Sequence, residues 1–160
     1  MKLHLALIAA VSLTASPAVL AETAPKVETS AKVAHGGLYE IAYNPADKRL
    51  YVAATGPRGA NAPKVVILDA TSLKQVGEID VSEVGLFGLG IDTRAQILYG
   101  TATSKGAIAA IDLKTGAVSS FTLDGSTGAH LREVVADEAS GKAYASLLVS
   151  GERDGPANAP

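Results

Sequence analysis

Two aromatic residues and one arginine occupy the same position in three successive blocks of a repeated sequence. They are Tyr39, Phe87 and Arg132, found by aligning the blocks on Tyr51, Tyr99 and Tyr144. Aromatic rings stack on unpaired nucleic-acid bases, and a guanidinium can hold a phosphate or lie over a ring. We therefore predict that these three residues form a ligand-binding site. The alternative for the two aromatic residues is packing between repeats, whereas an arginine is hard to bury.

Two carboxylates and two histidines lie close to this position in the sequence. Glu40 and Glu133 occupy the next aligned position, where the second block has Gly88, and His35 and His130 precede it. Histidines with nearby carboxylates could bind a transition metal, and carboxylates alone would repel a polyanion. The simpler interpretation is a solvated polar rim. Because the histidines and carboxylates have no tight ligand spacing, we predict no metal site.

Five acidic or amide residues recur at the ends of predicted strands. Each precedes a short polar segment, and in such turns a carboxylate or amide oxygen accepts hydrogen bonds from backbone N–H groups. Because they recur at the repeat period rather than converging on one place, we predict a structural role in turns for Asn44, Asp69, Asp92, Asp112 and Asp137.

Motifs of common enzyme classes are missing from the sequence. Residues 100–106 contain glycine, threonine and lysine, but not in the order G-x-x-x-x-G-K-[ST] of a phosphate-binding loop. Residues 125–128 do not form the nucleophile motif G-x-S-x-G. The chain has no cysteine, and its net charge of −2 does not call for a polyanionic partner. We predict a protein that is not an enzyme, with no catalytic residue and no cofactor.

The spacing of the repeat predicts the architecture that positions these residues. Tyr51 and Tyr99 are 48 residues apart, and Tyr99 and Tyr144 are 45 apart. Such periods are typical of solenoids and propellers. Each unit contains four short strands separated by turns, which is the content of one propeller blade. We predict an all-β fold, a β-propeller of four-stranded antiparallel blades at about 36–82, 83–125 and 126–160. The loop Gly56–Pro63 is longer than its counterpart, and we expect this insertion on the surface.

The third unit stops before its outer strands. Its ending, residues 151–160, resembles the loop 56–63 and shares the sequence Ala-Asn-Ala-Pro with it. Propellers need about four to eight blades, and an unfinished blade exposes an unpaired edge. We expect about two and a half blades of a larger ring, which makes this chain an N-terminal fragment. The alternatives are an open β-meander and a fold completed by oligomerisation.

The N-terminal segment has the pattern of an export signal. Lys2 precedes an apolar run, and small residues follow up to Ala21. We interpret residues 1–21 as a secretory signal peptide and residues 22–35 as a linker or N-terminal arm. We expect export to the periplasm, with no membrane association after cleavage of the signal.

The repeat units resemble a known family. Units with Leu-Tyr-Val-Ala, a later Ile-Asp pair and a threonine-containing turn resemble the YVTN type of β-propeller repeat. The segments 37–43, 109–116 and 132–137 resemble the exported bacterial YncE-like proteins. The resemblance covers about residues 36–150. It implies seven blades in the intact protein, a periplasmic location and binding of single-stranded DNA at the mouth of the central channel.

The site and the resemblance together give one leading hypothesis for the function. It is a non-enzymatic binding protein in which Tyr39 and Phe87 offer stacking faces and Arg132 holds a phosphate. The alternatives are a propeller enzyme, either lactonase-like or a quinoprotein-like dehydrogenase, and a scaffold that docks a partner protein on the propeller face. The expected partners are therefore single-stranded nucleic acid or another protein.

Overall fold

The computed structural model of the 160-residue chain describes residues 26–60, 62–122 and 129–148. Within these ranges the chain forms ten β-strands and no helix. No described helix could therefore span a membrane. The expected signal peptide and the repeated ending at 151–160 lie outside the described residues. The strands are β1 (Leu38–Asn44), β2 (Arg49–Ala54), β3 (Lys64–Asp69), β4 (Gln75–Asp80), β5 (Gly88–Asp92), β6 (Ile97–Ala102), β7 (Ala107–Asp112), β8 (Val118–Thr122), β9 (His130–Asp137) and β10 (Lys142–Leu148).

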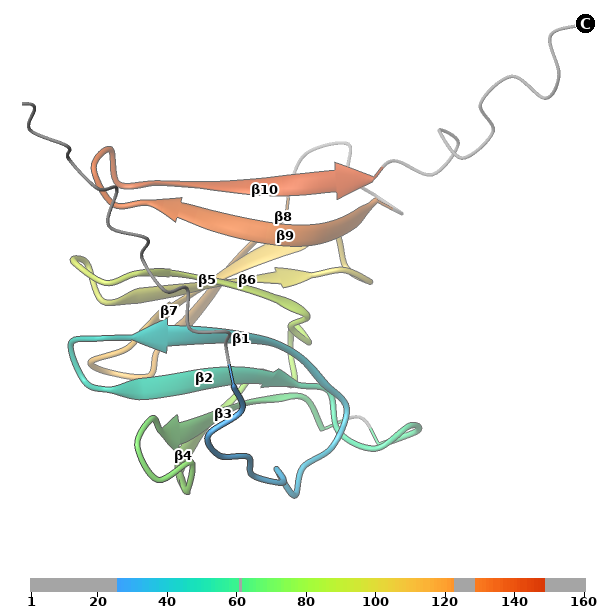
Figure 1. Cartoon of the computed structure of the whole chain (residues 1–160). Helices are drawn as coiled ribbons and strands as arrows, with labels where there is room; N and C mark the ends of the chain where they lie inside the picture. Colours follow the sequence, from blue (N-terminus) through green and yellow to red (C-terminus); the bar gives the residue numbers. More distant parts are fainter. Residues whose placement is uncertain (1–25, 61, 123–128, 149–160) are drawn as a thin grey trace, which may run out of the picture.

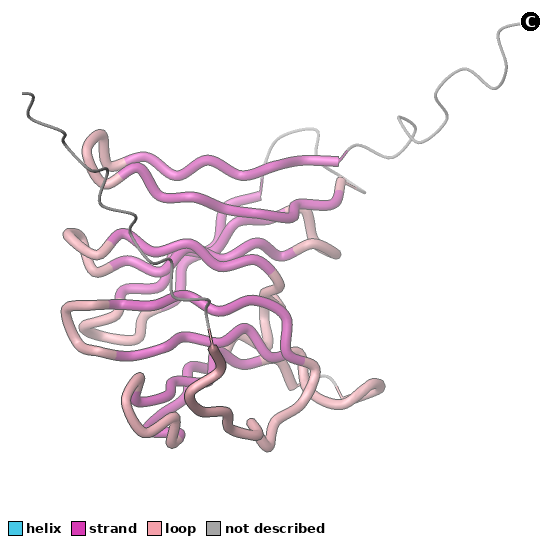
Figure 2. Tube along the Cα trace, viewed as in Figure 1, coloured by secondary structure: helices cyan, strands magenta, loops and turns pink. Residues whose placement is uncertain are grey.

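The strands form three antiparallel sheets that stack one on another (Figure 1). The first sheet has the order β1-β2-β3-β4, the second has the order β5-β6-β7-β8, and the third contains β9 and β10. Where the structure describes the segments between strands, they are loops or turns (Figure 2). The first strands of the three sheets lie next to one another, β1 against β5 and β5 against β9. The predicted fold class, an all-β propeller with about two and a half blades present, is confirmed.

The main core lies between the first and second sheets. Side chains that alternate along the strands meet there, because successive residues of a strand point to opposite faces. Tyr51 and Leu98 are 1% and 0% exposed. Tyr144, at the same repeat position as Tyr51, is 58% exposed on the third sheet. The third sheet is the last of the stack within the described part of the chain, so this repeat position has no neighbouring sheet there.

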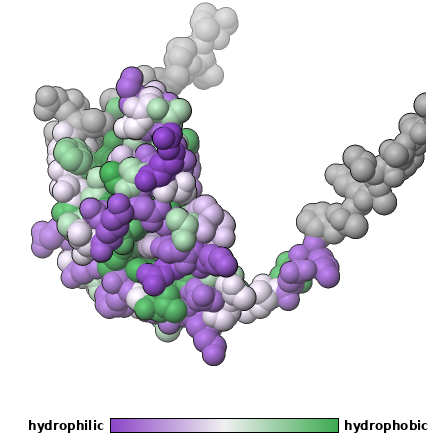
Figure 3. Space-filling model, turned by 90° about the vertical axis from the view of Figure 1, so that its left-hand side faces the viewer, coloured by the Kyte–Doolittle hydropathy of each residue, from purple (hydrophilic) through white to green (hydrophobic). Residues whose placement is uncertain are grey.

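The five predicted turn residues all accept backbone hydrogen bonds in the turns that follow them. Asp92 Oδ1, for example, accepts from the N–H groups of Arg94 at 3.0 Å and Ala95 at 2.7 Å. Hydrogen bonds from backbone N–H groups hold the carboxyl pKa values of Asp69 and Asp112 below their ordinary value. The Ser140 hydroxyl, together with backbone N–H groups, lowers the pKa of Asp137. The structural role predicted for them is confirmed. Asn44 Oδ1 accepts from Ala46 N–H at 3.1 Å. Hydrophilic residues are prominent on the side of the stack that Figure 3 faces, with apolar residues between them.

Candidate functional site

The first strand of the first and third sheets contains a bulge at the predicted site position. Leu38 on β1 pairs with Ala54 on β2, and the next pair is Ile41 with Val52. Between these two pairs β1 is therefore one residue longer than β2, and the extra residue lies at Tyr39-Glu40. The same difference between β9 and β10 places an extra residue at Arg132-Glu133. A bulge breaks the strict alternation of side chains and re-aims those that it contains. Tyr39 and Arg132 are exposed although both lie in inner strands.

The second sheet has an equivalent irregularity at Phe87-Gly88. Phe87 N–H donates to the carbonyl oxygen of Thr101, and Gly88 N–H donates to the Thr101 hydroxyl, both at 2.9 Å. Two consecutive residues thus share one partner on β6, as in a bulge. The arrangement at Phe87-Gly88 thus resembles a bulge, while β5 and β6 pair without a register shift from Gly88 onward.

Tyr39 and Phe87 contact each other edge to face. Their ring centroids are 4.6 Å apart, and the ring planes are inclined at 71°. Such geometry is favourable for aromatic pairs beyond the burial of their surface. Tyr39 nevertheless remains 61% exposed, and Phe87 is half-buried. The pair bridges two sheets, as the packing alternative expects, and still presents an aromatic surface to the outside.

Hydroxyl groups from β6 and the turn after it hold the Arg132 backbone against the second sheet. Thr101 Oγ1 donates to the carbonyl oxygen of Arg132 at 2.5 Å, and Thr103 Oγ1 donates to that of Leu131 at 2.6 Å. A Cβ added to Gly88 would come closer than 3.0 Å to the Arg132 carbonyl oxygen, and one at Gly90 would collide with β9 in the same way. Glycine at both positions is therefore what lets β9 approach β5.

All three predicted residues line one pocket of about 500 Å³. Glu40, Gly88, Thr103 and Glu133 complete its lining. The volume lies in the range of small-molecule sites, which is about 300–1,000 Å³. The structure therefore brings Tyr39, Phe87 and Arg132 together from β1, the start of β5 and β9.

Glu40 is more than the solvated rim residue that its sequence position suggests. Its carboxylate is partly buried and accepts a hydrogen bond from Leu89 N–H at 3.0 Å, which ties β1 to β5. Burial raises the pKa of Glu40, the hydrogen bond from Leu89 lowers it, and the neighbouring Glu133 carboxylate raises it. The net direction is upward. Glu133 itself is exposed beside Arg132.

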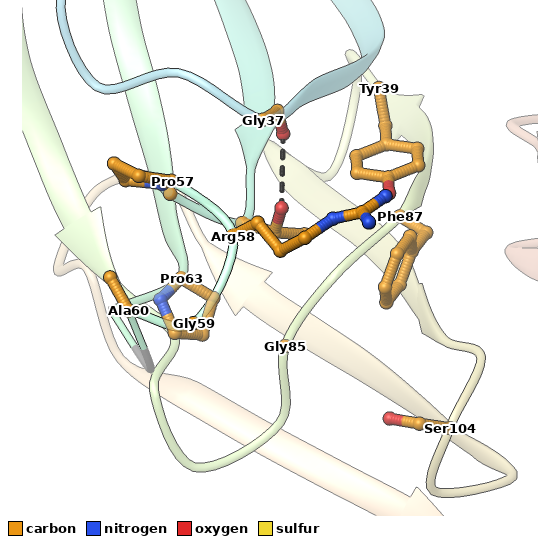
Figure 4. Close-up of a pocket in the computed structure, with 12 residues that line it drawn as sticks. Gly37, Tyr39, Pro57, Arg58, Gly59, Ala60, Pro63, Gly85, Phe87 and Ser104 are labelled. Carbon is orange, nitrogen blue, oxygen red and sulfur yellow. Dashed lines mark hydrogen bonds between the residues drawn. The ribbon is translucent and has the colours of Figure 1, made fainter.

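The sequence did not identify Arg58, which lines a second pocket on the other side of the aromatic pair. This pocket of about 490 Å³ also includes Tyr39 and Phe87. Figure 4 shows the Arg58 side chain reaching across the pocket toward the two rings. The available signal was the loop Gly56–Pro63, whose insertion carries an arginine between glycines and prolines. It was expected to be on the surface, and it also forms a wall of this pocket.

The two histidines have different surroundings. His35 Nε2 lies 2.6 Å from the carbonyl oxygen of Ala62 and so links the segment before β1 to the inserted loop. His130 is the first residue of β9 and pairs with Leu148. In the ranges described by the structure, no three His, Asp or Glu side chains gather as a metal-ligand set.

Comparison with known proteins identifies the fold alone. No family model matches the chain, and no curated protein matches it in sequence. A chain of the nidogen/laminin complex is similar with a TM-score of 0.56 and 16% identity over 68% of this chain and 38% of that one. Kuenenia stuttgartiensis hydrazine synthase is similar with a TM-score of 0.56 and 16% identity, over 80% of this chain and 37% of that one. The Cps50 (Swd1) β-propeller domain of Myceliophteria thermophila is similar with a TM-score of 0.55 and 12% identity, over 72% of this chain and 33% of that one.

These similarities have two consequences. The chain spans between about a third and two fifths of the length of the solved structures that it matches. One of the three is named as an enzyme and one as a component of a protein complex, so the fold accommodates more than one kind of activity. Any function has to be argued from the residues of the site.

Proposed function

We propose that this chain belongs to a non-enzymatic β-propeller protein that binds single-stranded nucleic acid at one end of its inner strands. The observation that carries the proposal is the aromatic pair of Tyr39 and Phe87 with Arg132 in the same pocket. Stacking on aromatic rings suits every base, and a guanidinium suits the backbone phosphate. A single strand offers both groups at once, whereas a duplex keeps its bases stacked on one another.

The site position supports this proposal over simple packing. The bulges aim Tyr39 and Arg132 outward, and Tyr39 keeps 61% of its surface exposed. A core aromatic residue is buried, as Tyr51 on the neighbouring strand β2 is at 1% exposure. An exposed ring in contact with a second ring is a preformed surface, so binding requires little further ordering of the protein.

The carboxylates of Glu40 and Glu133 oppose the binding of a phosphate at Arg132. The effect of Glu40 depends on its protonation, since burial raises the pKa of this carboxyl and so favours its neutral form as the pH falls. We therefore propose that the affinity for single strands increases as the pH falls from neutral.

The resemblance to YncE-like proteins and the periplasmic location are part of the same proposal. The segments 37–43, 109–116 and 132–137 support the family assignment, and the N-terminal pattern of residues 1–21 supports export. The exposed Tyr144, equivalent to the buried Tyr51, supports the view that a further sheet packs on β9 and β10 in the complete ring.

The experiment is a titration of a labelled oligo-dT with the full chain, followed by fluorescence anisotropy. Tyr39→Ala should weaken binding by about 1–3 kcal/mol, the usual contribution of one stacked base. Arg132→Ala should also weaken binding, and the loss of affinity should be larger at low salt than at high salt. The matched control is Arg49→Ala, which removes an exposed arginine at the other end of the β1–β2 hairpin. Equal losses for Arg132→Ala and Arg49→Ala would reject the site.

A further inference from the structure

The aromatic pair separates two pockets, and each pocket has its own arginine. Tyr39 and Phe87 line both, Arg132 lines the one on the side of β9, and Arg58 lines the one on the side of the inserted loop. The two pockets have similar volumes, about 490 and 500 Å³. Neither guanidinium is in an ion pair with a described residue. Both cations are thus available to an anionic ligand, one in each of the two pockets that share the aromatic pair, which we call the aromatic ridge.

The loop that carries Arg58 is fastened to the body of the protein. At its start, Thr55 N–H donates to the Gly37 carbonyl oxygen at 2.9 Å, and at its end Val81 N–H donates to that of Pro63 at 3.3 Å. The contact of His35 with Ala62 links its second half to the segment before β1. These connections come from two separate parts of the chain, the segment before β1 and the residue that follows β4, so they hold both ends of the loop in place.

A tight turn presents Arg58 at the tip of this loop. Ala60 N–H donates to the Pro57 carbonyl oxygen at 2.9 Å, which closes a four-residue turn with Arg58 at its second position. Gly59, at the third position, has a φ of +89°. A positive φ there is the requirement of a type II turn and favours glycine. The side chain next to it extends toward the two rings (Figure 4).

The two pockets differ in charge. The pocket of Arg132 contains two carboxylates, those of Glu40 and Glu133. Among the described residues, none that lines the pocket of Arg58 is acidic. A phosphate beside Arg58 therefore meets a cation without a neighbouring carboxylate, and at neutral pH this is the more favourable of the two positions.

We propose that Arg58 is a second phosphate-binding residue, and that the ligand is a strand with at least two phosphates that crosses the ridge formed by Tyr39 and Phe87. One phosphate lies beside Arg58, the next part of the strand stacks on the rings, and a further phosphate lies beside Arg132. This inference rests on the proposed function, since it specifies the ligand of the same site. It predicts that a mononucleotide fills one pocket only, and that an oligonucleotide engages both.

The salt dependence of binding counts the phosphate contacts. For single strands, the slope of log K against log salt concentration is about −0.7 per neutralised phosphate. For oligo-dT binding by the full chain, the magnitude of this slope should therefore decrease by about 0.7 in Arg58→Ala, by about 0.7 in Arg132→Ala and by about 1.4 in the double variant. Arg58→Lys keeps the charge and should keep most of the slope. Arg49→Ala is the control and should leave it unchanged.

The outcomes separate this inference from the proposed function. If the wild-type chain binds and only Arg132→Ala changes the slope, the proposed function stands and the role of Arg58 is wrong. If the wild-type chain does not bind, both are wrong. A second readout is ligand length. The gain in affinity from thymidine monophosphate to a short oligo-dT should be severalfold larger for the wild type than for Arg58→Ala, and an equal gain would also overturn the inference. Urea unfolding at an unchanged midpoint establishes that each variant is folded.

Discussion

Replacing Gly90 by alanine should separate β9 from β5 and destabilise the protein. A Cβ at this position would lie 3.0 Å from the carbonyl carbon of Val134 and closer still to its oxygen. The obstacle is backbone, which cannot rotate away as a flexible side chain could, so β9 itself has to move. Gly90 has no positive φ, and the predicted loss is therefore steric rather than a matter of backbone strain.

The size of the effect follows from what the displacement breaks. Overpacking of a core typically costs about 1–3 kcal/mol. The hydrogen bonds of Thr101 to Arg132 and of Thr103 to Leu131 join the same two sheets, and each contributes about 0.5–1.5 kcal/mol. If both are lost with the close approach, the free energy of unfolding falls by about 2–6 kcal/mol. This is a large share of the roughly 5–15 kcal/mol available to a typical domain.

Urea unfolding followed by far-ultraviolet circular dichroism measures this loss, since the chain has no tryptophan for fluorescence. The matched control is Gly77→Ala on β4, where a Cβ would make an ordinary contact of 3.5 Å with the Ile67 side chain. That variant should be neutral or more stable by up to about 1 kcal/mol, because alanine restricts the unfolded chain. Equal unfolding midpoints for Gly90→Ala and Gly77→Ala would refute the role of the close approach.

Three further predictions concern ionisable groups. Glu40→Gln should strengthen oligo-dT binding at pH 7. The gain in affinity should shrink toward pH 4.5, because burial raises the pKa of the wild-type carboxyl and it becomes protonated as the pH falls. A gain in affinity that is independent of pH would contradict this. The pKa of Asp137 is lower in the folded protein than the ordinary value of 3.8, so this carboxylate stabilises the fold at a pH above 3.8 and the stabilisation is lost as the pH falls. Asp137→Asn should therefore make the urea midpoint less sensitive to acid. An unchanged pH profile would argue against the hydrogen bonds in this turn. Tyr51 donates to Asp47 at 2.6 Å and is buried, which raises its pKa to about 12. The stabilisation by this hydroxyl is present below pH 10 and is lost as the pH rises toward 12. In Tyr51→Phe the last step of an ultraviolet titration of the tyrosines should disappear, and the free energy of unfolding at pH 7 should fall by about 1 kcal/mol.

The repeat made much of the fold predictable. Turn residues such as Asp92 and Asp112 recur at fixed places, and their short-range hydrogen bonds are a local property that the sequence displays directly. The grouping of Tyr39, Phe87 and Arg132 was predictable for the same reason. Residues at one position of a propeller repeat lie at the same level along its axis on neighbouring blades, whatever their side chains are.

The features that sequence analysis missed depend on contacts between repeats. Arg58 lies in an insertion without a counterpart in the second unit, and its place beside the rings follows from the packing of its loop on Gly37 and His35. Likewise, the hydrogen bond between Glu40 and Leu89 depends on the distance between β1 and β5. The bulges were also missed, because one extra residue in a strand is recognised only from its pairing with the neighbouring strand.

The most direct test of the proposed function compares single-stranded with double-stranded DNA of the same sequence. The full chain is titrated against labelled oligonucleotides of both kinds at low salt, and the fluorescence anisotropy is recorded. Because only unpaired bases can stack on Tyr39 and Phe87, we predict clearly tighter binding of the single strand and a loss of that preference in Tyr39→Ala. Equal or tighter binding of the duplex, or no binding of either, would contradict the account.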